Sequence, residues 1–213
     1  MPEPTATAAT SLDSLLQGGR PLRITRWGEA VLHRPTRPVE VFDAEFQTLL
    51  RDMFATMLAA DGVGLASTQV DDDRSFFIFR CPDADGRVLI GAVCNPVVEL
   101  PSGRNRHLVS EEEGCLSLPG AYAPLARPDH AICRGSDHNG QPLEIVGTGL
   151  LARCLQHETD HLSGTVFGDR LSSRVRGRLQ ASHLETAYRY PPDWPISPKR
   201  PFRPEGAPDG PSA

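Results

Sequence analysis

The alternation of apolar and polar residues predicts two amphipathic helices. From residue 44 to residue 61, apolar side chains recur three and four positions apart and form a stripe that we expect to pack in the core. The stripe consists of Leu49, Leu50, Met53, Met57 and Ala60. A second amphipathic pattern covers residues 172–190 and predicts another helix.

The pattern between these helices is typical of short strands. Runs rich in β-branched and aromatic residues are separated by glycine, proline or aspartate, which favours strands joined by turns. The predicted strands are residues 75–81, 88–100, 106–112, 129–137 and 141–147. The last two flank Asn139 and Gly140, a pair typical of a tight hairpin.

A third helix is predicted directly after the last strand, over residues 150–163. Thr148 is a suitable N-cap and Gly164 a suitable C-terminal stop. Elements in this order predict the α+β class, with small antiparallel β-sheets packed around this central helix.

The two ends of the chain differ in composition from the rest. Residues 1–20 are small, polar and rich in proline, threonine and alanine, and residues 191–213 contain too many prolines for a helix. We therefore expect a disordered N-terminal extension, one domain over residues 21–190 and a flexible C-terminal tail.

Composition argues against several classes of protein. The formal net charge of −5 disfavours a general polyanion binder and specific DNA binding, although a local basic patch is compatible with it. Five cysteines without a C-x-x-C pair disfavour a disulfide framework and a zinc ribbon, and favour a reducing, intracellular setting. We find neither a signal peptide nor an apolar run of the ~20 residues that cross a bilayer, so we expect a soluble protein without membrane contact.

The central helix carries the clearest chemical signal. His157 and His161 lie four residues apart, with Glu158 between them. Side chains at this spacing share one helix face, with β-carbons about 5–6 Å apart. The H-E-x-x-H pattern therefore indicates two imidazole ligands for one metal ion beside a carboxylate. The alternative is a pair of ordinary core or surface histidines.

Two histidines need a third protein ligand, since catalytic zinc or iron usually has three. Asp169 is the nearest carboxylate after the helix, but Cys115 stands between glycine and leucine in a polar, turn-forming stretch. A thiolate beside two imidazoles binds divalent metals well. We expect the remaining strand cysteines to be buried and inert, namely Cys81, Cys94 and Cys133.

Three segments together resemble the motifs of the peptide deformylase family. They read GVGLASTQ at residues 62–69, EGCLS at residues 113–117 and QHETDHL at residues 156–162. The resemblance implies a metal-dependent hydrolase that removes the formyl group from the N-terminal formylmethionine of newly synthesised polypeptides and releases formate. Its partners would be N-formylmethionyl peptides and nascent chains.

By this resemblance, Cys115, His157 and His161 would bind one divalent metal ion, which makes the predicted central helix a metal-binding helix. The resemblance favours Fe²⁺. A site of one thiolate and two imidazoles also accepts Zn²⁺, Ni²⁺ or Co²⁺.

The resemblance also implies the groups that act on the substrate. Glu158 would serve as general acid and base, while the Gln69 amide and the backbone N–H of Leu116 would donate hydrogen bonds to the formyl oxygen. Two positions depart from the common family pattern: Ser67 replaces a usual alanine, and Thr159 replaces a frequent apolar residue. We expect both changes to have minor effects.

Helix geometry indicates where the substrate would lie. Leu150, Arg153 and Cys154 stand seven, four and three residues before the first histidine ligand and share its face. Together with Val63 and Gly64 of the first motif, they would form an apolar slot for the methionine side chain. Arg153 would lay its stem along the wall and keep its charge in water. Plain core packing is the alternative for Leu150 and Cys154.

Asp160, next to the second histidine, has two interpretations. It could orient a histidine or pair with an arginine such as Arg127. The alternative is an ordinary carboxylate on the solvated surface of the helix.

Action on nascent chains implies the bacterial cytoplasm and a transient contact with the ribosome. Arg174, Arg176 and Arg178 form a basic cluster that would suit RNA phosphates, and a solvated helix surface explains the cluster equally well. Two alternative functions stay open from sequence. One is a zinc endopeptidase with its third ligand downstream, and the other is a catalytically idle metal-binding module associated with the ribosome.

Overall fold

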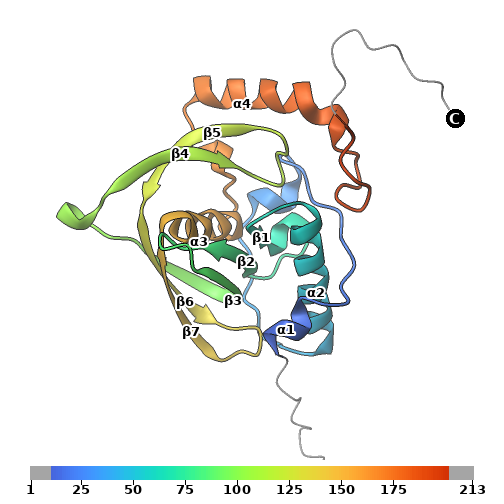
Figure 1. Cartoon of the computed structure of the whole chain (residues 1–213), viewed down its shortest axis with the longest axis vertical. Helices are drawn as coiled ribbons and strands as arrows, with labels where there is room; N and C mark the ends of the chain where they lie inside the picture. Colours follow the sequence, from blue (N-terminus) through green and yellow to red (C-terminus); the bar gives the residue numbers. More distant parts are fainter. Residues whose placement is uncertain (1–10, 202–213) are drawn as a thin grey trace, which may run out of the picture.

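The computed structural model describes residues 11–201 of the chain, and Figure 1 shows the order of its elements. Its strands are β1 (Gly64–Ala66), β2 (Phe76–Pro82), β3 (Val88–Glu99), β4 (Leu108–Gly114), β5 (Tyr122–Pro128), β6 (His130–Ser136) and β7 (Pro142–Thr148). Its helices are α1 (Leu12–Leu15), α2 (Ala44–Ala59), α3 (Gly149–Leu162) and α4 (Ser173–Thr186). Over the described range, no helix is long and apolar enough to span a membrane.

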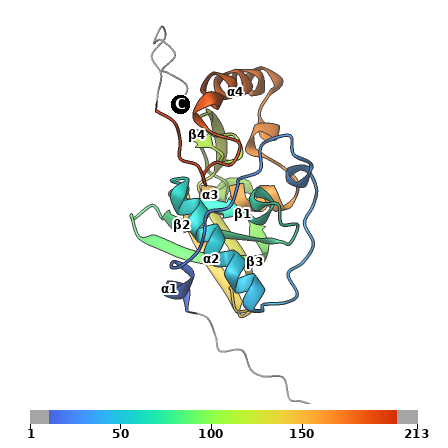
Figure 2. The ribbon, with the colours of Figure 1, turned by 90° about the vertical axis from the view of Figure 1, so that its right-hand side faces the viewer.

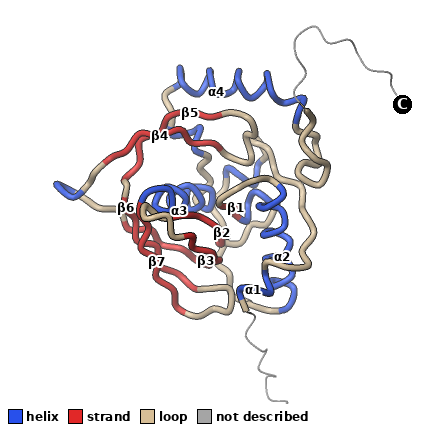
Figure 3. Tube along the Cα trace, viewed as in Figure 1, coloured by secondary structure: helices blue, strands red, loops and turns tan. Residues whose placement is uncertain are grey.

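The strands form two antiparallel sheets, which confirms the predicted α+β class (Figure 3). The larger sheet has the strand order β1-β2-β3-β6-β7, and β4 pairs with β5 in the smaller one. The register between β3 and β6 shifts between Cys94 and Val97. Asn95 lies in this irregular stretch with a φ of 53°, and its side chain accepts a hydrogen bond from the backbone N–H of Val39 at 2.8 Å. The polar side chain thus ties the irregular strand to the segment before α2.

The part of the larger sheet formed by β1, β2 and β3 is buried on both faces, each against one helix. Successive side chains of a strand point to opposite faces, and residues 76–79 of β2 alternate in this way between two buried clusters. Phe76 and Ile78 pack in the cluster that contains the apolar face of α2. Phe77 and Phe79 pack in the cluster that contains the apolar face of α3. The predicted core stripe on α2 and the predicted central helix therefore cover opposite sides of one sheet.

Helix α3 lies between the two sheets, as Figure 1 shows. It begins after Thr148, the predicted N-cap position, and Gly164 follows its end with a φ of 80°. A Cβ on Gly147 would lie 2.8 Å from a methyl group of Leu155 and 3.1 Å from the backbone of Ala152. Glycine at this position therefore lets the strand before the helix approach the helix closely.

Strand β5 was absent from the expectation based on sequence. It contains Pro124 and Pro128, and proline lacks the N–H that a strand interior donates. In the two-stranded sheet each strand has only one neighbour, so β5 tolerates both prolines along its pairing with β4. Strand β1, inside the glycine-rich first motif, was missed because it is only three residues long.

The folded region reaches beyond the predicted boundaries of 21–190. Leu15 of α1 is fully buried and Trp194 is 4% exposed, and both pack in the core cluster of α2. The prediction of a disordered extension and a flexible tail is therefore wrong for these parts. Large apolar side chains find a place in the core even in a segment rich in proline. Residues 1–10 and 202–213 lie outside the described residues.

Candidate metal centre and active site

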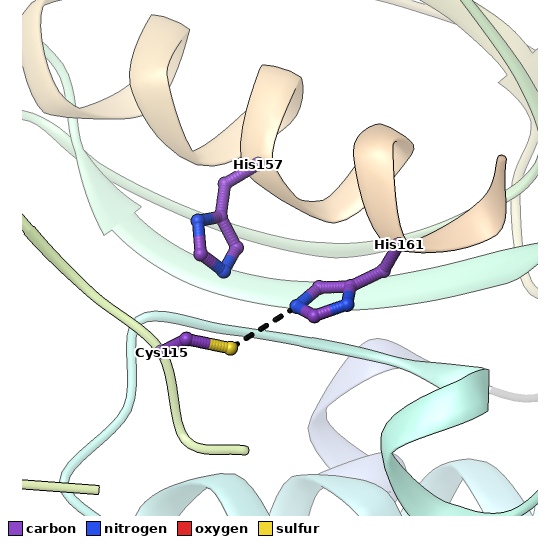
Figure 4. Close-up of side chains that lie close together, drawn as sticks. All are labelled: Cys115, His157 and His161. Atoms are coloured by element: carbon purple, nitrogen blue, oxygen red, sulfur yellow. Dashed lines mark hydrogen bonds between the residues drawn. The ribbon is translucent and has the colours of Figure 1, made fainter. Parts of the chain in front are cut away.

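Three side chains from two distant segments meet in the interior. His157 and His161 stand one turn apart on α3, with ring centroids 5.0 Å apart, and Cys115 directly follows β4. One ligand atom from each of the three lies within 4.8 Å of the others. The Cys115 Sγ is 3.2 Å from Nε2 of His161, and a dashed line marks this contact in Figure 4. All three side chains are buried.

This donor set fits a divalent transition metal. One thiol and two imidazoles are common ligands of zinc and iron, and three protein ligands leave a position for water or substrate. In Figure 4 the Nε2 of His157 points toward the other two residues. Its Nδ1 lies 2.8 Å from Oε1 of Glu113. Because an ionised carboxylate only accepts hydrogen bonds, Nδ1 carries the proton and Nε2 keeps its lone pair for a metal.

Glu113 is the hub of the contacts behind the metal centre. It is 4% exposed and accepts hydrogen bonds from Nη2 and Nε of Arg127 at 2.6 and 2.8 Å, and from Nη1 of Arg153 at 2.9 Å. Burial alone would raise the pKa of Glu113, but the hydrogen bonds from Arg127 and His157 outweigh it and hold the pKa well below its usual range. Glu113 is therefore an anion fixed behind His157.

Asp160 continues this network. Nη1 of Arg127 donates to its Oδ2 at 2.9 Å, which confirms the expected partner, and Arg170 binds the same carboxylate. Asp169, the other carboxylate considered as a metal ligand, instead accepts a hydrogen bond from the backbone N–H of Val166 at 3.0 Å. Asp169 is not part of the group of donor atoms around the two histidines.

Glu158 lies beside the metal centre without a partner for one of its oxygens. It is 4% exposed, and within the described part of the chain its Oε2 has no hydrogen bond. Burial raises the pKa of Glu158 to about 7. A Cβ on Gly64 would overlap with Oε1 of Glu158 and with the Cys154 sulfur, so the glycine of the first motif makes room for the carboxyl group.

Gln69 is fixed beside Cys115. Its Oε1 accepts a hydrogen bond from the backbone N–H of Ala66 at 2.9 Å, which orients the amide. The amide nitrogen lies 3.5 Å from the Cys115 sulfur and 3.2 Å from Oγ of Ser117. The N–H groups of the Gln69 amide therefore lie beside Cys115, one of the three candidate metal ligands.

Leu116 lines the same cavity as Gln69. Among the described residues, its backbone N–H donates to no backbone carbonyl. Ser67 points elsewhere, since its hydroxyl donates to the carbonyl of Arg74 at 2.5 Å. The departure from the family pattern at Ser67 therefore leaves the donors around Cys115 in place.

A cavity of about 640 Å³ opens onto these groups. All residues expected to contact the substrate line it, namely Val63, Gly64, Leu150, Arg153 and Cys154. Val63 and Leu150 are 39% and 40% exposed. The neighbouring Cys81 thiol and burial raise the pKa of Cys154, so its thiol stays protonated. Burial likewise raises the pKa of Cys133 to about 12, in accordance with an inert role.

The expectation for Arg153 was wrong in one respect. Its charge was expected in water, but the side chain is only 7% exposed. Besides Glu113, its guanidinium donates to the backbone carbonyls of Leu125 and Val109, each at 2.9 Å. In this position a buried carboxylate and two strand carbonyls are stronger hydrogen-bond acceptors for the guanidinium than water is. Arg153 therefore connects α3 to both strands of the smaller sheet.

Sequence reasoning missed Glu113 although it lies inside a quoted motif. Residues 111–113 are three consecutive glutamates, and only Glu113 is buried. The available signal was its position two residues before Cys115, because strand side chains two apart share a face.

Comparison with known proteins agrees with this geometry. A family model described as Polypeptide deformylase matches residues 21–177, most of the chain. The chain belongs to the polypeptide deformylase family.

Individual deformylases resemble the chain over most of their own length. Peptide deformylase 1 of Streptomyces avermitilis is 49% identical over 169 residues, which cover 79% of this chain and 78% of the relative. A solved peptide deformylase from Legionella pneumophila has a TM-score of 0.70 and 35% identity, covering 80% of this chain and 96% of that one. A peptide deformylase from Synechococcus elongatus, solved in complex with actinonin, has a TM-score of 0.69 and 35% identity, with coverages of 80% and 90%.

These matches confirm the function expected from the resemblance. The chain is a hydrolase of the deformylase family, whose members depend on a metal and remove the formyl group from formylmethionyl nascent peptides. The Cys115, His157 and His161 group is a site at which such a metal fits.

The position of Glu113 generates a first prediction. In the Glu113→Gln variant, the buried guanidinium groups of Arg127 and Arg153 lose their ionised partner. We expect the free energy of unfolding to fall by about 3–5 kcal/mol, and the affinity for a divalent metal to fall about 10- to 100-fold because His157 loses its orienting carboxylate. Urea denaturation and metal titration measure the two effects.

The matched control is Glu111→Gln on the same strand. The Glu111 side chain is 57% exposed and lies 3.5 Å from Nε of Arg153, so its loss should cost less than about 1 kcal/mol. Equal, small decreases in the free energy of unfolding and in metal affinity for both variants would contradict the role assigned to the buried charge of Glu113.

Proposed function

We propose that Cys115, His157 and His161 hold one divalent metal ion at which the formyl amide of N-formylmethionyl peptides is hydrolysed. The observation that carries this proposal is the meeting of three metal-binding side chains and a buried carboxyl group at one cavity. When bound, the ion supplies Lewis acidity toward a carbonyl oxygen and makes water more acidic.

Glu158 moves the protons in this proposal. It accepts a proton from the attacking water and passes a proton to the departing amine. Its unpartnered Oε2 supports the role, because that atom is free to bind water or substrate. The pKa of about 7 also supports it, since a group that both accepts and donates a proton works best near the ambient pH.

Gln69 and Leu116 stabilise the negative charge that develops on the formyl oxygen. The Gln69 amide is held by Ala66 with its donors toward Cys115, and the N–H of Leu116 follows Cys115 in the chain. Such donors act without reorganising during the reaction, and removing one typically costs about 10²- to 10³-fold in rate.

The methionine side chain enters the apolar part of the cavity. Val63, Leu150 and Cys154 offer apolar surface there, and Gly64 keeps the carboxyl group of Glu158 close. The guanidinium of Arg153 does not contact the substrate, because it is paired with Glu113 and with strand carbonyls. A slot of this composition favours an unbranched, polarisable side chain such as methionine.

The role of Glu158 is tested by Glu158→Gln. The variant keeps the size of the side chain but cannot accept the proton, so we expect formate release from a formyl-Met tripeptide to fall by about 10²- to 10⁴-fold while the metal stays bound. Glu144→Gln, the same change at an exposed position of β7 outside the cavity, is the control. Undiminished formate release by a metal-loaded Glu158→Gln enzyme would contradict the role.

We propose Fe²⁺ as the native metal. A thiolate beside two imidazoles suits ferrous iron as well as zinc, and the two differ in their response to oxygen. Protein purified without oxygen should lose activity in air and keep it under argon, as the iron and the Cys115 thiolate oxidise. The measurements are the rate of formate release, the metal content and the mass of the peptide containing Cys115. Equal persistence of activity in air and argon points to zinc instead.

We also propose that the enzyme works in the bacterial cytoplasm with a transient contact to ribosomes. Arg176 is engaged with the backbone carbonyls of Gly168 and Asp169, whereas Arg174 and Arg178 are exposed on α4. The latter two therefore suit RNA phosphates.

Co-sedimentation with ribosomes at low salt tests this contact. Arg174→Glu with Arg178→Glu should reduce the bound fraction, and added salt should reduce it for the wild type as counterions compete. Arg134→Glu, a change of an exposed arginine in the larger sheet, is the control. Wild-type protein that fails to co-sediment at low salt contradicts the proposed contact.

A further inference from the structure

The cavity next to the metal centre has a wall that the first motif and α3 do not supply. The chain folds back after α4, and Tyr190, Trp194, Pro195, Pro198 and Lys199 line the same cavity as the ligand histidine on α3. Figure 2 shows this segment in red as it leaves α4. The family model ends at residue 177, so this wall lies outside the region that defines the family.

The wall is fixed to the body of the enzyme. The ring of Trp194 packs in the core and meets the ring of Tyr190 nearly at right angles, with centroids 5.2 Å apart. The Trp194 carbonyl accepts a hydrogen bond from the backbone N–H of Ile24 at 3.2 Å. Arg26 donates to the carbonyl of Pro191 at 3.0 Å and stacks over the Trp194 ring at 5.4 Å. A substrate therefore meets a preformed surface.

Lys199 brings a cation to this surface. Its side chain is exposed and its Nζ lies 5.4 Å from the centre of the Tyr190 ring. The other cationic side chain in the lining, Arg153, is already paired with Glu113. Within the described residues, no carboxylate lies within ion-pair distance of Lys199. Lys199 is therefore the cation of the lining that is available to a substrate.

Two carboxylates elsewhere in the cavity lining confine the attraction of an acidic substrate side chain to the neighbourhood of Lys199. Asp61, after α2, and Glu112, on β4, also line the cavity. An acidic side chain of a bound peptide would be repelled near either carboxylate and attracted near Lys199. A basic side chain would experience the opposite.

We propose that Lys199 is a specificity-determining residue, which pairs with an acidic side chain in the part of the nascent chain that follows formylmethionine. The inference rests on the proposed function of the site. The aromatic and proline side chains of residues 190–198 provide the surface along which the peptide backbone lies. Lys199 forms an ion pair with an acidic side chain at one position beyond the methionine.

Steady-state kinetics test this proposal. The substrates are formyl-Met peptides with amidated C-termini that carry a single Glu, Gln or Lys at the second, third or fourth position. At one of these positions the KM of the wild type should be about two- to tenfold lower for Glu than for Lys, as expected for one exposed ion pair and its like-charge counterpart. The preference should shrink as salt is added, because exposed charges are screened.

Three variants separate charge from structure. Lys199→Glu should reverse the preference, and Lys199→Arg should retain it. Arg200→Glu makes the same change of charge at the next residue, which is exposed but does not line the cavity, and it should leave the ratio of KM values as in the wild type.

Chemical cross-linking gives a readout independent of turnover. Lys199 is the only lysine among the 213 residues. A formyl-Met peptide with an amine-reactive ester at the preferred position, added to metal-loaded Glu158→Gln, should acylate Lys199. Mass mapping distinguishes this product from acylation of the N-terminal amine.

The outcomes distinguish the two proposals. Absence of formate release from every peptide by the metal-loaded wild type overturns the proposed function. Formate release with equal KM values for Glu and Lys peptides at every position, without acylation of Lys199, overturns only the role of Lys199.

Discussion

The buried carboxylate of Glu113 is the interaction on which the active site depends. Removing a charge from water costs several kcal/mol unless opposite charges and hydrogen bonds replace the solvent. Here the replacement comes from Arg127 on β5 and from Arg153 and His157 on α3. The need to satisfy one anion therefore holds the smaller sheet against the central helix. The same contact orients the imidazole of His157.

The two sheets have different tasks around α3. Strands β1, β2 and β3 of the larger sheet are buried on both faces, and their alternating apolar side chains support α2 on one side and α3 on the other. The smaller sheet contributes few apolar contacts to α3 but carries Glu113 and delivers Cys115 at the end of β4. Apolar packing thus positions the helix, while a polar network positions the thiol against the two imidazoles. Gly64 completes the arrangement because no side chain separates β1 from Glu158.

The cavity is lined partly by residues within the family match, 21–177, and partly by a wall formed by residues 190–199. The three motifs surround the donor group from within residues 21–177, and residues 190–199 reach the cavity only because Trp194 is anchored in the core. In our proposals, the residues that bind the reacting amide and the residues that contact the peptide beyond the methionine are therefore separate in sequence. Under these proposals, changes in residues 190–199 alter which peptides bind while the metal centre stays intact.

The sequence by itself determined the elements and chemistry that depend on neighbouring residues. The cap signals at Thr148 and Gly164 predicted α3 to within one residue of its ends, and the spacing of His157 and His161 predicted that both imidazoles lie on one face. The three motifs indicated the family. Such features are local, since helix and strand geometry relate residues only a few positions apart.

Only the tertiary structure decided which distant groups meet. It selected Glu113 from three consecutive glutamates, turned the charge of Arg153 inward to a partner 40 residues away, and brought the proline-rich segment around Trp194 into the core. It also formed β5 despite its two prolines. The physical reason is that the partner of a buried charge or a large apolar ring is set by contacts between segments far apart in the chain, which no local pattern contains.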